Sequence, residues 1–109
     1  MATIEFDELF ETLKTGIVGL AKTTVNDYLA QATEEGQNAL DGMKADIQQW
    51  SLSLAAGDMN TEDLKFLVEG RKEIIEMRGL EQVGIAEIQL DSFKNGIVNL
   101  IITTVSKVI

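Results

Sequence analysis

FETLKTGIVGLAKTTVNDYL, at residues 10–29, and LDSFKNGIVNLIITTVSKVI, at residues 90–109, are closely similar stretches of one chain. Aligned without a gap, they are identical at Lys14/Lys94, Gly16/Gly96, Ile17/Ile97, Val18/Val98, Leu20/Leu100, Thr23/Thr103, Thr24/Thr104 and Val25/Val105. Amphipathic helices that converged by composition could share some of these residues. Because Gly-Ile-Val and Thr-Thr-Val recur at the same separation, we favour a duplication or a shared pseudo-symmetric packing role.

Apolar positions in both stretches recur at steps of three and four residues, which predicts two amphipathic helices. In the first helix the apolar face comprises Phe6, Phe10, Leu13, Ile17, Leu20, Thr24 and Tyr28. In the second it comprises Ala86, Leu90, Phe93, Ile97, Leu100, Thr104 and Val108. The many β-branched residues near the C-terminus would also suit a strand. The shared helical register, and the lack of a second strand-like run, favour a helix.

Gly16 and Gly96 occupy matching places within these apolar faces. A glycine inside a helix costs about 1 kcal/mol relative to alanine, so we expect close approach of a neighbouring helix to offset that cost. Trp50 continues a similar apolar face with Ile47 and Leu54. The residues predicted for helix packing or for an oligomer interface are Phe10, Leu13, Gly16, Ile17, Leu20, Trp50, Phe93, Gly96, Ile97 and Leu100.

The apolar periodicity and the capping signals predict helices at about 3–32, 37–56, 61–78 and 85–109. The clearest boundary lies at Gly57, which fits the position after a helix end, with Asn60 or Thr61 as the next N-cap. Two weaker breaks, at 33–38 and at 79–84, could each be bridged by a continuous helix.

The chain contains no proline, so nothing in it forces a helix to break. We therefore predict a single all-α domain over residues 1–109, with its main turn near Gly57 and pseudo-equivalent terminal helices. Two arrangements remain open, an antiparallel hairpin of two long helices and an up-down helical bundle.

Composition excludes several classes of function. Cysteine and histidine are both absent, which removes thiol chemistry, the usual general base at neutral pH and the commonest metal ligand. Glutamates 69, 73 and 76 share a helix face, but we interpret them as a solvated surface rather than a metal site. We therefore predict no enzyme activity, no catalytic residue, no cofactor and no metal.

The net charge of −9 disfavours binding to nucleic acid and makes anionic membrane surfaces an improbable target. The acidic N-terminal sequence MATIEFDELFE does not have the basic and apolar regions of a signal peptide. The uncharged run at 95–106 is shorter than the roughly 20 residues that span a bilayer. We expect a soluble, cytoplasmic protein.

We predict a structural or interaction protein that self-associates through its duplicated helices as an assembly component or adaptor. Its partner would be another copy of the chain or a different helical protein. The alternative is a binding module for an apolar ligand or a basic amphipathic peptide, with Met43, Met59 and Met77 as adaptable contacts.

The size, acidity, lack of cysteine and central Trp50 resemble those of the WXG family, small helical-hairpin proteins exported by specialised secretion systems. In this sequence Trp50 is followed by Ser51 and Leu52, not by the Trp-x-Gly pattern of that family. The resemblance therefore implies a similar size and shape and assigns no functional residue.

Overall fold

A computed structural model of the chain describes residues 6–72, 75 and 77–107. These residues form an all-helical structure, and the described part contains no strand. The elements are α1 (Phe6–Thr24), the 3₁₀ turn η1 (Asn26–Tyr28), α2 (Leu29–Gly42), α3 (Lys44–Ala55), α4 (Thr61–Lys72), α5 (Arg78–Gln82) and α6 (Glu87–Ser106).

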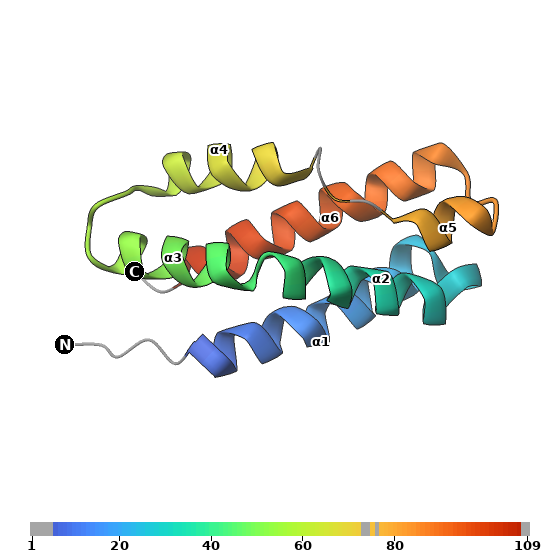
Figure 1. The fold of residues 1–109 in the computed structure, drawn as a ribbon, viewed down its shortest axis with the longest axis horizontal. Coiled ribbons are helices and arrows are strands. Elements are labelled where there is room, and N and C mark those ends of the chain that lie inside the picture. The colour runs from blue at the N-terminus through green and yellow to red at the C-terminus, as the bar shows by residue number, and fades with distance from the viewer. Residues whose placement is uncertain (1–5, 73–74, 76, 108–109) are drawn as a thin grey trace.

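The helices lie roughly along one long axis (Figure 1). Helix α1 runs in one direction, α2 and α3 return, α4 runs back, and α6 returns again. Helix α6 packs against α1, α3 and α4, while α1 also packs against α2. Helices α1 and α6, which carry most of the matching sequence, therefore lie side by side and antiparallel.

The chain first reverses at Val25, not in the 33–38 region where the sequence predicted a break. Helix α1 ends at Thr24, so the predicted helix 3–32 is wrong. Val25 adopts φ −138° and ψ 47°, which is not helical, and its side chain is fully buried. Since α1 and α2 pack against each other, they are not one continuous rod.

Helix α2 runs unbroken through 33–38, which is the continuous alternative that the sequence left open, and Gly36 is a packing contact there. A Cβ atom on Gly36 would lie only 2.6 Å from Ile17 Cγ2 of α1. The next interruption lies at Met43, where φ is −104° and ψ is 6°. Met43 is itself buried in the core, so packing holds the bend between α2 and α3.

The turn near Gly57 lies where the sequence predicted it. Helix α3 ends at Ala55 and Gly57 has a φ of +80°, a conformation that glycine adopts without strain. The Asp63 amide donates to Asn60 Oδ1 over 2.9 Å, while the Asn60 amide donates to Asp63 Oδ2 over 3.2 Å. This reciprocal cap begins α4 at Thr61.

The later boundaries differ from the predicted ones. Helix α4 ends at Lys72 rather than near residue 78, and the buried, non-helical Ile75 and Met77 lead into α5. The 79–84 region is not a simple loop, since α5 occupies residues 78–82 and the chain turns at Gly84, where φ is +84°. Helix α6 covers residues 87–106 of the predicted 85–109. Residues 73, 74, 76, 108 and 109, and the predicted helix start at residues 3–5, lie outside the described part.

Candidate interaction face between α1 and α6

The residues predicted for packing or for an oligomer interface separate into an internal set and a peripheral set. The internal set is buried and consists of Phe10, Leu13 and Ile17 of α1, Trp50 of α3, and Phe93 and Ile97 of α6. These side chains pack against each other inside the molecule and are closed to any partner. The peripheral set is half-buried and consists of Gly16, Leu20, Gly96 and Leu100.

The peripheral residues pack as two crossed pairs. A Cβ atom on Gly16 would lie 2.8 Å from Leu100 Cδ1, and a Cβ atom on Gly96 would lie 2.6 Å from Leu20 Cδ1. Each leucine therefore occupies the space left by a glycine on the opposite helix. Gly96 lies eighty positions after Gly16, and Leu100 lies eighty positions after Leu20, so the matched sequences make matched contacts.

A shallow groove of about 450 Å³ lies over these crossed pairs on the outer side of α1 and α6. It is lined by Gly16, Gly19, Leu20 and Thr23 of α1 and by Gly96, Asn99, Leu100 and Thr103 of α6. Every α1 residue in this lining has its counterpart eighty positions later. The lining contains no charged side chain, although the whole chain has a net charge of −9.

Covering this groove would leave few α1 hydrogen-bonding groups without a partner. The Thr23 hydroxyl donates within its own helix, to the carbonyl oxygens of Leu20 at 3.0 Å and Gly19 at 3.3 Å. The hydroxyl of Thr12, one turn before Gly16 on the same side, donates to the Glu8 carbonyl oxygen at 3.0 Å. Because these hydroxyls already donate hydrogen bonds within α1, an apolar partner that buried them would not leave their donors unsatisfied.

The side of α6 that lines the groove also carries an exposed apolar residue near the start of the helix. Residues 88, 92, 96, 99 and 103 follow one another at helical spacing, so they share one side of α6. Ile88, at the start of this series, is 82% exposed. A partner that extended beyond the groove along this side of α6 could also cover Ile88.

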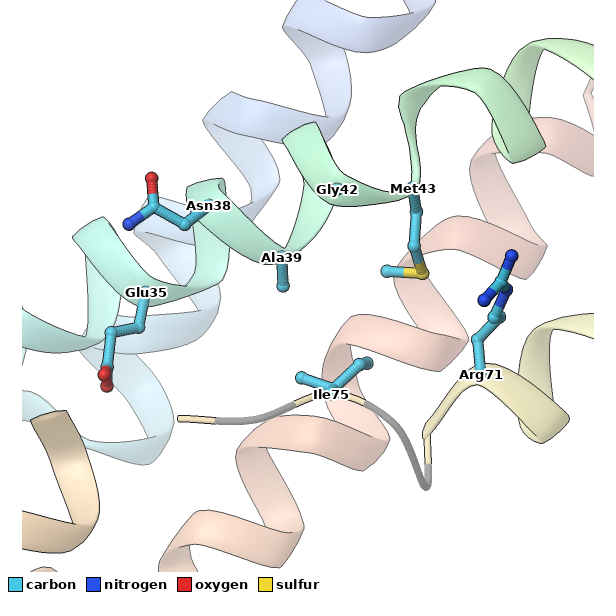
Figure 2. Close-up of a pocket in the computed structure, with 7 residues that line it drawn as sticks. All are labelled: Glu35, Asn38, Ala39, Gly42, Met43, Arg71 and Ile75. Carbon is cyan, nitrogen blue, oxygen red and sulfur yellow. The ribbon is translucent and has the colours of Figure 1, made fainter. Parts of the chain in front are cut away.

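A second cavity, of about 300 Å³, lies between α2, the bend at Met43, the end of α4 at Arg71, and Ile75 (Figure 2). Its charged side chains already have partners inside the molecule. Glu35 accepts hydrogen bonds from the backbone amides of Gly79 at 2.5 Å and Leu80 at 2.8 Å, and Arg71 forms an ion pair with Asp46. Glu35 and Arg71 therefore make contacts between helices. Neither side chain is left without a partner to bind a ligand in the cavity.

The methionines of the predicted ligand-binding alternative do not gather at one surface. Met77 is fully buried and Met43 is 6% exposed, so both contribute to the core. Met43 lines the cavity of Figure 2, while Met59 is half-buried beside the Gly57 turn. This distribution gives no support to a methionine-lined groove.

The described residues also lack two features that would indicate other functions. In that part of the chain, no cluster of three or more potential metal-ligating residues has a geometry that could hold an ion. None of the described helices combines the length and the hydrophobicity that crossing a membrane requires.

Sequence reasoning identified Gly16, Leu20, Gly96 and Leu100 but missed the rest of the groove. Gly19 and Thr23 lie three and seven residues after Gly16, and Asn99 and Thr103 lie at the same steps after Gly96. Thr23 and Thr103 are themselves an identical pair of the matched stretches. Extending the glycine positions along the helix face would have found them. Comparison of the chain with protein-family models, curated proteins and solved structures finds no match.

Proposed function

We propose that this protein is a non-enzymatic structural component that self-associates through the outer sides of α1 and α6. The observation that carries the proposal is the uncharged groove over the Gly16–Leu100 and Gly96–Leu20 contacts. In this proposal the protein acts as an assembly component or adaptor, and its principal partner is another copy of the chain.

The uncharged lining of the groove is the part of the surface where the net charge opposes a second copy least. Two molecules that each carry a net charge of −9 repel each other, and contact is least unfavourable where both surfaces are uncharged. The groove lining provides such a surface. A basic peptide would instead be attracted to acidic residues, which this lining lacks.

Symmetry also supports self-association. The matched contacts of α1 and α6 are consistent with a local pseudo-two-fold axis that passes near Val18 and Val98, midway between the crossed pairs. Homo-oligomers most often form by two-fold symmetric contact of the same patch on both molecules. In the proposed arrangement, each copy presents the same uncharged patch, with its small residues close to the centre.

Burial of the internal set limits which residues can contact a partner. Because Leu13, Ile17, Phe93 and Ile97 are already buried within one molecule, a partner contacts the peripheral set instead. By this route, monomers that are already folded associate, and their helices do not have to separate first.

Sedimentation equilibrium over a wide range of protein concentration tests the proposed function. We expect the average mass to rise above the 12.0 kDa of one chain as concentration increases. A mass that stays at 12.0 kDa up to roughly millimolar concentration, where even contacts of about −4 kcal/mol are populated, would exclude self-association.

A further inference from the structure

We propose that a second copy of this chain sits on the α1–α6 groove in a closed, two-fold symmetric dimer, with the stacked helices of the two copies antiparallel. This inference rests on the proposed function and adds the number of copies, the symmetry and the direction of the helices in the contact. Its closest alternatives are an open chain of copies and a different surface of contact.

The antiparallel arrangement follows from the directions of α1 and α6, which are opposite within one molecule (Figure 1). A two-fold axis along the helices places α1 over the partner's α6. A two-fold axis across them places α1 over the partner's α1. In both cases the helices that stack run in opposite directions, so both arrangements are closed dimers with the same surface buried.

The outline of the whole α1–α6 face, which extends beyond the groove, sets an upper limit on the area and matches a weak dimer. Helix α1 has 19 residues, which gives a length of roughly 28 Å, and two adjacent helices are roughly 20 Å wide. This footprint amounts to roughly 1,100 Å² for the two copies together, just below the roughly 1,200–2,000 Å² of standard interfaces. Ile88, which lies on the same side of α6 and is 82% exposed, would add apolar area to such a contact. We therefore expect a dissociation constant in the micromolar range or weaker.

The centre of the contact is defined by the crossed glycine–leucine pairs. Gly16 is level with Leu100, and Leu20 is level with Gly96, so positions 18 and 98 lie at the midpoint of the groove. Gly19 lies next to that midpoint and is exposed. In a two-fold symmetric dimer, a charge at residue 19 would be buried close to the same charge on the partner.

Gly19→Glu therefore tests the surface without disturbing the fold. A Cβ atom on Gly19 meets nothing within 4 Å, so the larger side chain fits the monomer. Gly70→Glu is the matched control, because Gly70 is also an exposed glycine inside a helix with nothing within 4 Å of an added Cβ. It lies on α4, away from the groove, and adds the same charge.

We expect Gly19→Glu to weaken the dimer by roughly tenfold or more, since it buries two like charges together. Gly70→Glu should change the dissociation constant by less than about twofold, because its added charge is exposed to solvent and far from the groove. Ile88→Ser should weaken association by several-fold through lost apolar burial. Sedimentation equilibrium measures all three, and far-UV circular dichroism with thermal unfolding verifies that each variant is folded.

The outcomes separate this inference from the proposed function. A wild-type protein that associates, with Gly19→Glu and Gly70→Glu equally associated, would refute the groove as the interface and leave self-association intact. Masses that grow beyond two copies would refute the closed dimer. A wild-type chain that stays monomeric at every concentration would refute the proposed function, and with it this inference.

Discussion

Glycines in this chain differ in what surrounds them, and that difference decides what each one does. Gly36 lies inside α2 with Ile17 Cγ2 and Phe93 Cζ at 2.6 Å and 3.2 Å from where its Cβ would be. Gly19 has nothing within 4 Å of the same position. Sequence alone gives both as glycines in a helical region, and the neighbouring helix distinguishes them.

Replacing these two glycines with alanine should therefore shift stability in opposite directions. Gly36→Ala places a methyl group against Ile17, which is fully buried and β-branched and so has little freedom to move. We expect it to lower the free energy of unfolding by about 1–3 kcal/mol. Gly19→Ala should raise it by about 0.5–1 kcal/mol, because alanine favours the helix and meets no neighbour.

Urea unfolding followed by circular dichroism measures both variants under the same conditions. The opposite signs provide an internal control, since both replacements make the same chemical change. A Gly36→Ala protein as stable as Gly19→Ala would show that α1 and α2 do not approach as closely as described.

At the scale of whole elements, helix identity followed from the sequence more readily than helix ends. The three- and four-residue spacing predicted α1 and α6, and the Gly57 turn was marked by a glycine and an N-cap. The reversal at Val25 carries neither glycine nor proline. It follows a β-branched run and precedes Asn26 and Asp27, which favour turns, and burial of the Val25 side chain holds it in place.

The candidate face was predicted in part for a similar reason. Matched glycines and leucines can be read from the sequence, but their crossed pairing depends on α1 and α6 being antiparallel neighbours. The sequence also placed Leu20 and Leu100 in the main apolar face. In the structure, Ala21 and Ile101 occupy the fully buried positions, and the two leucines lie at the periphery. The three- and four-residue spacing of an apolar face does not determine which of two adjacent residues is the more deeply buried.

Helix α5 depends on a contact that periodicity cannot reveal. Glu35 of α2 accepts hydrogen bonds from the first amides of α5, at Gly79 and Leu80, and so caps this short helix from a distant part of the chain. A Cβ atom on Gly79 would lie 2.6 Å from Glu35 Oε1, so the absence of a side chain permits the contact. The carboxylate thus fixes the start of α5 onto α2.

Glu35→Gln should weaken this attachment. Glutamine retains one acceptor oxygen but turns an amide donor towards the other backbone N–H group, and it removes the charge that favours a helix N-terminus. We expect the free energy of unfolding to fall by about 1–2 kcal/mol, and amide exchange at Leu80 to become faster. Glu34→Gln, which changes an exposed neighbour by the same charge, is the control. Equal stability of the two variants would show that the cap is not needed.

At the scale of the molecule, net charge and the uncharged groove act against each other. Each copy carries a net charge of −9, so the long-range interaction of two copies is repulsive, whereas the groove lining is uncharged. Association therefore depends on short-range apolar contact exceeding a repulsion that salt can screen. Binding of a basic peptide would have the opposite balance, because the long-range term would then be attractive.

Salt concentration consequently distinguishes the two kinds of partner. Raising sodium chloride from about 0.1 M to about 1 M shortens the screening length from about 10 Å to about 3 Å. We expect the dissociation constant of the self-associated protein to fall several-fold over this range, because repulsion between the two −9 molecules is removed while apolar contact persists. Sedimentation equilibrium at both salt concentrations measures the change, with Gly19→Glu as a variant whose added repulsion should make the salt effect larger. Association that weakens as salt rises would mean that attraction between opposite charges holds the copies together, and the uncharged groove could not then be the main contact.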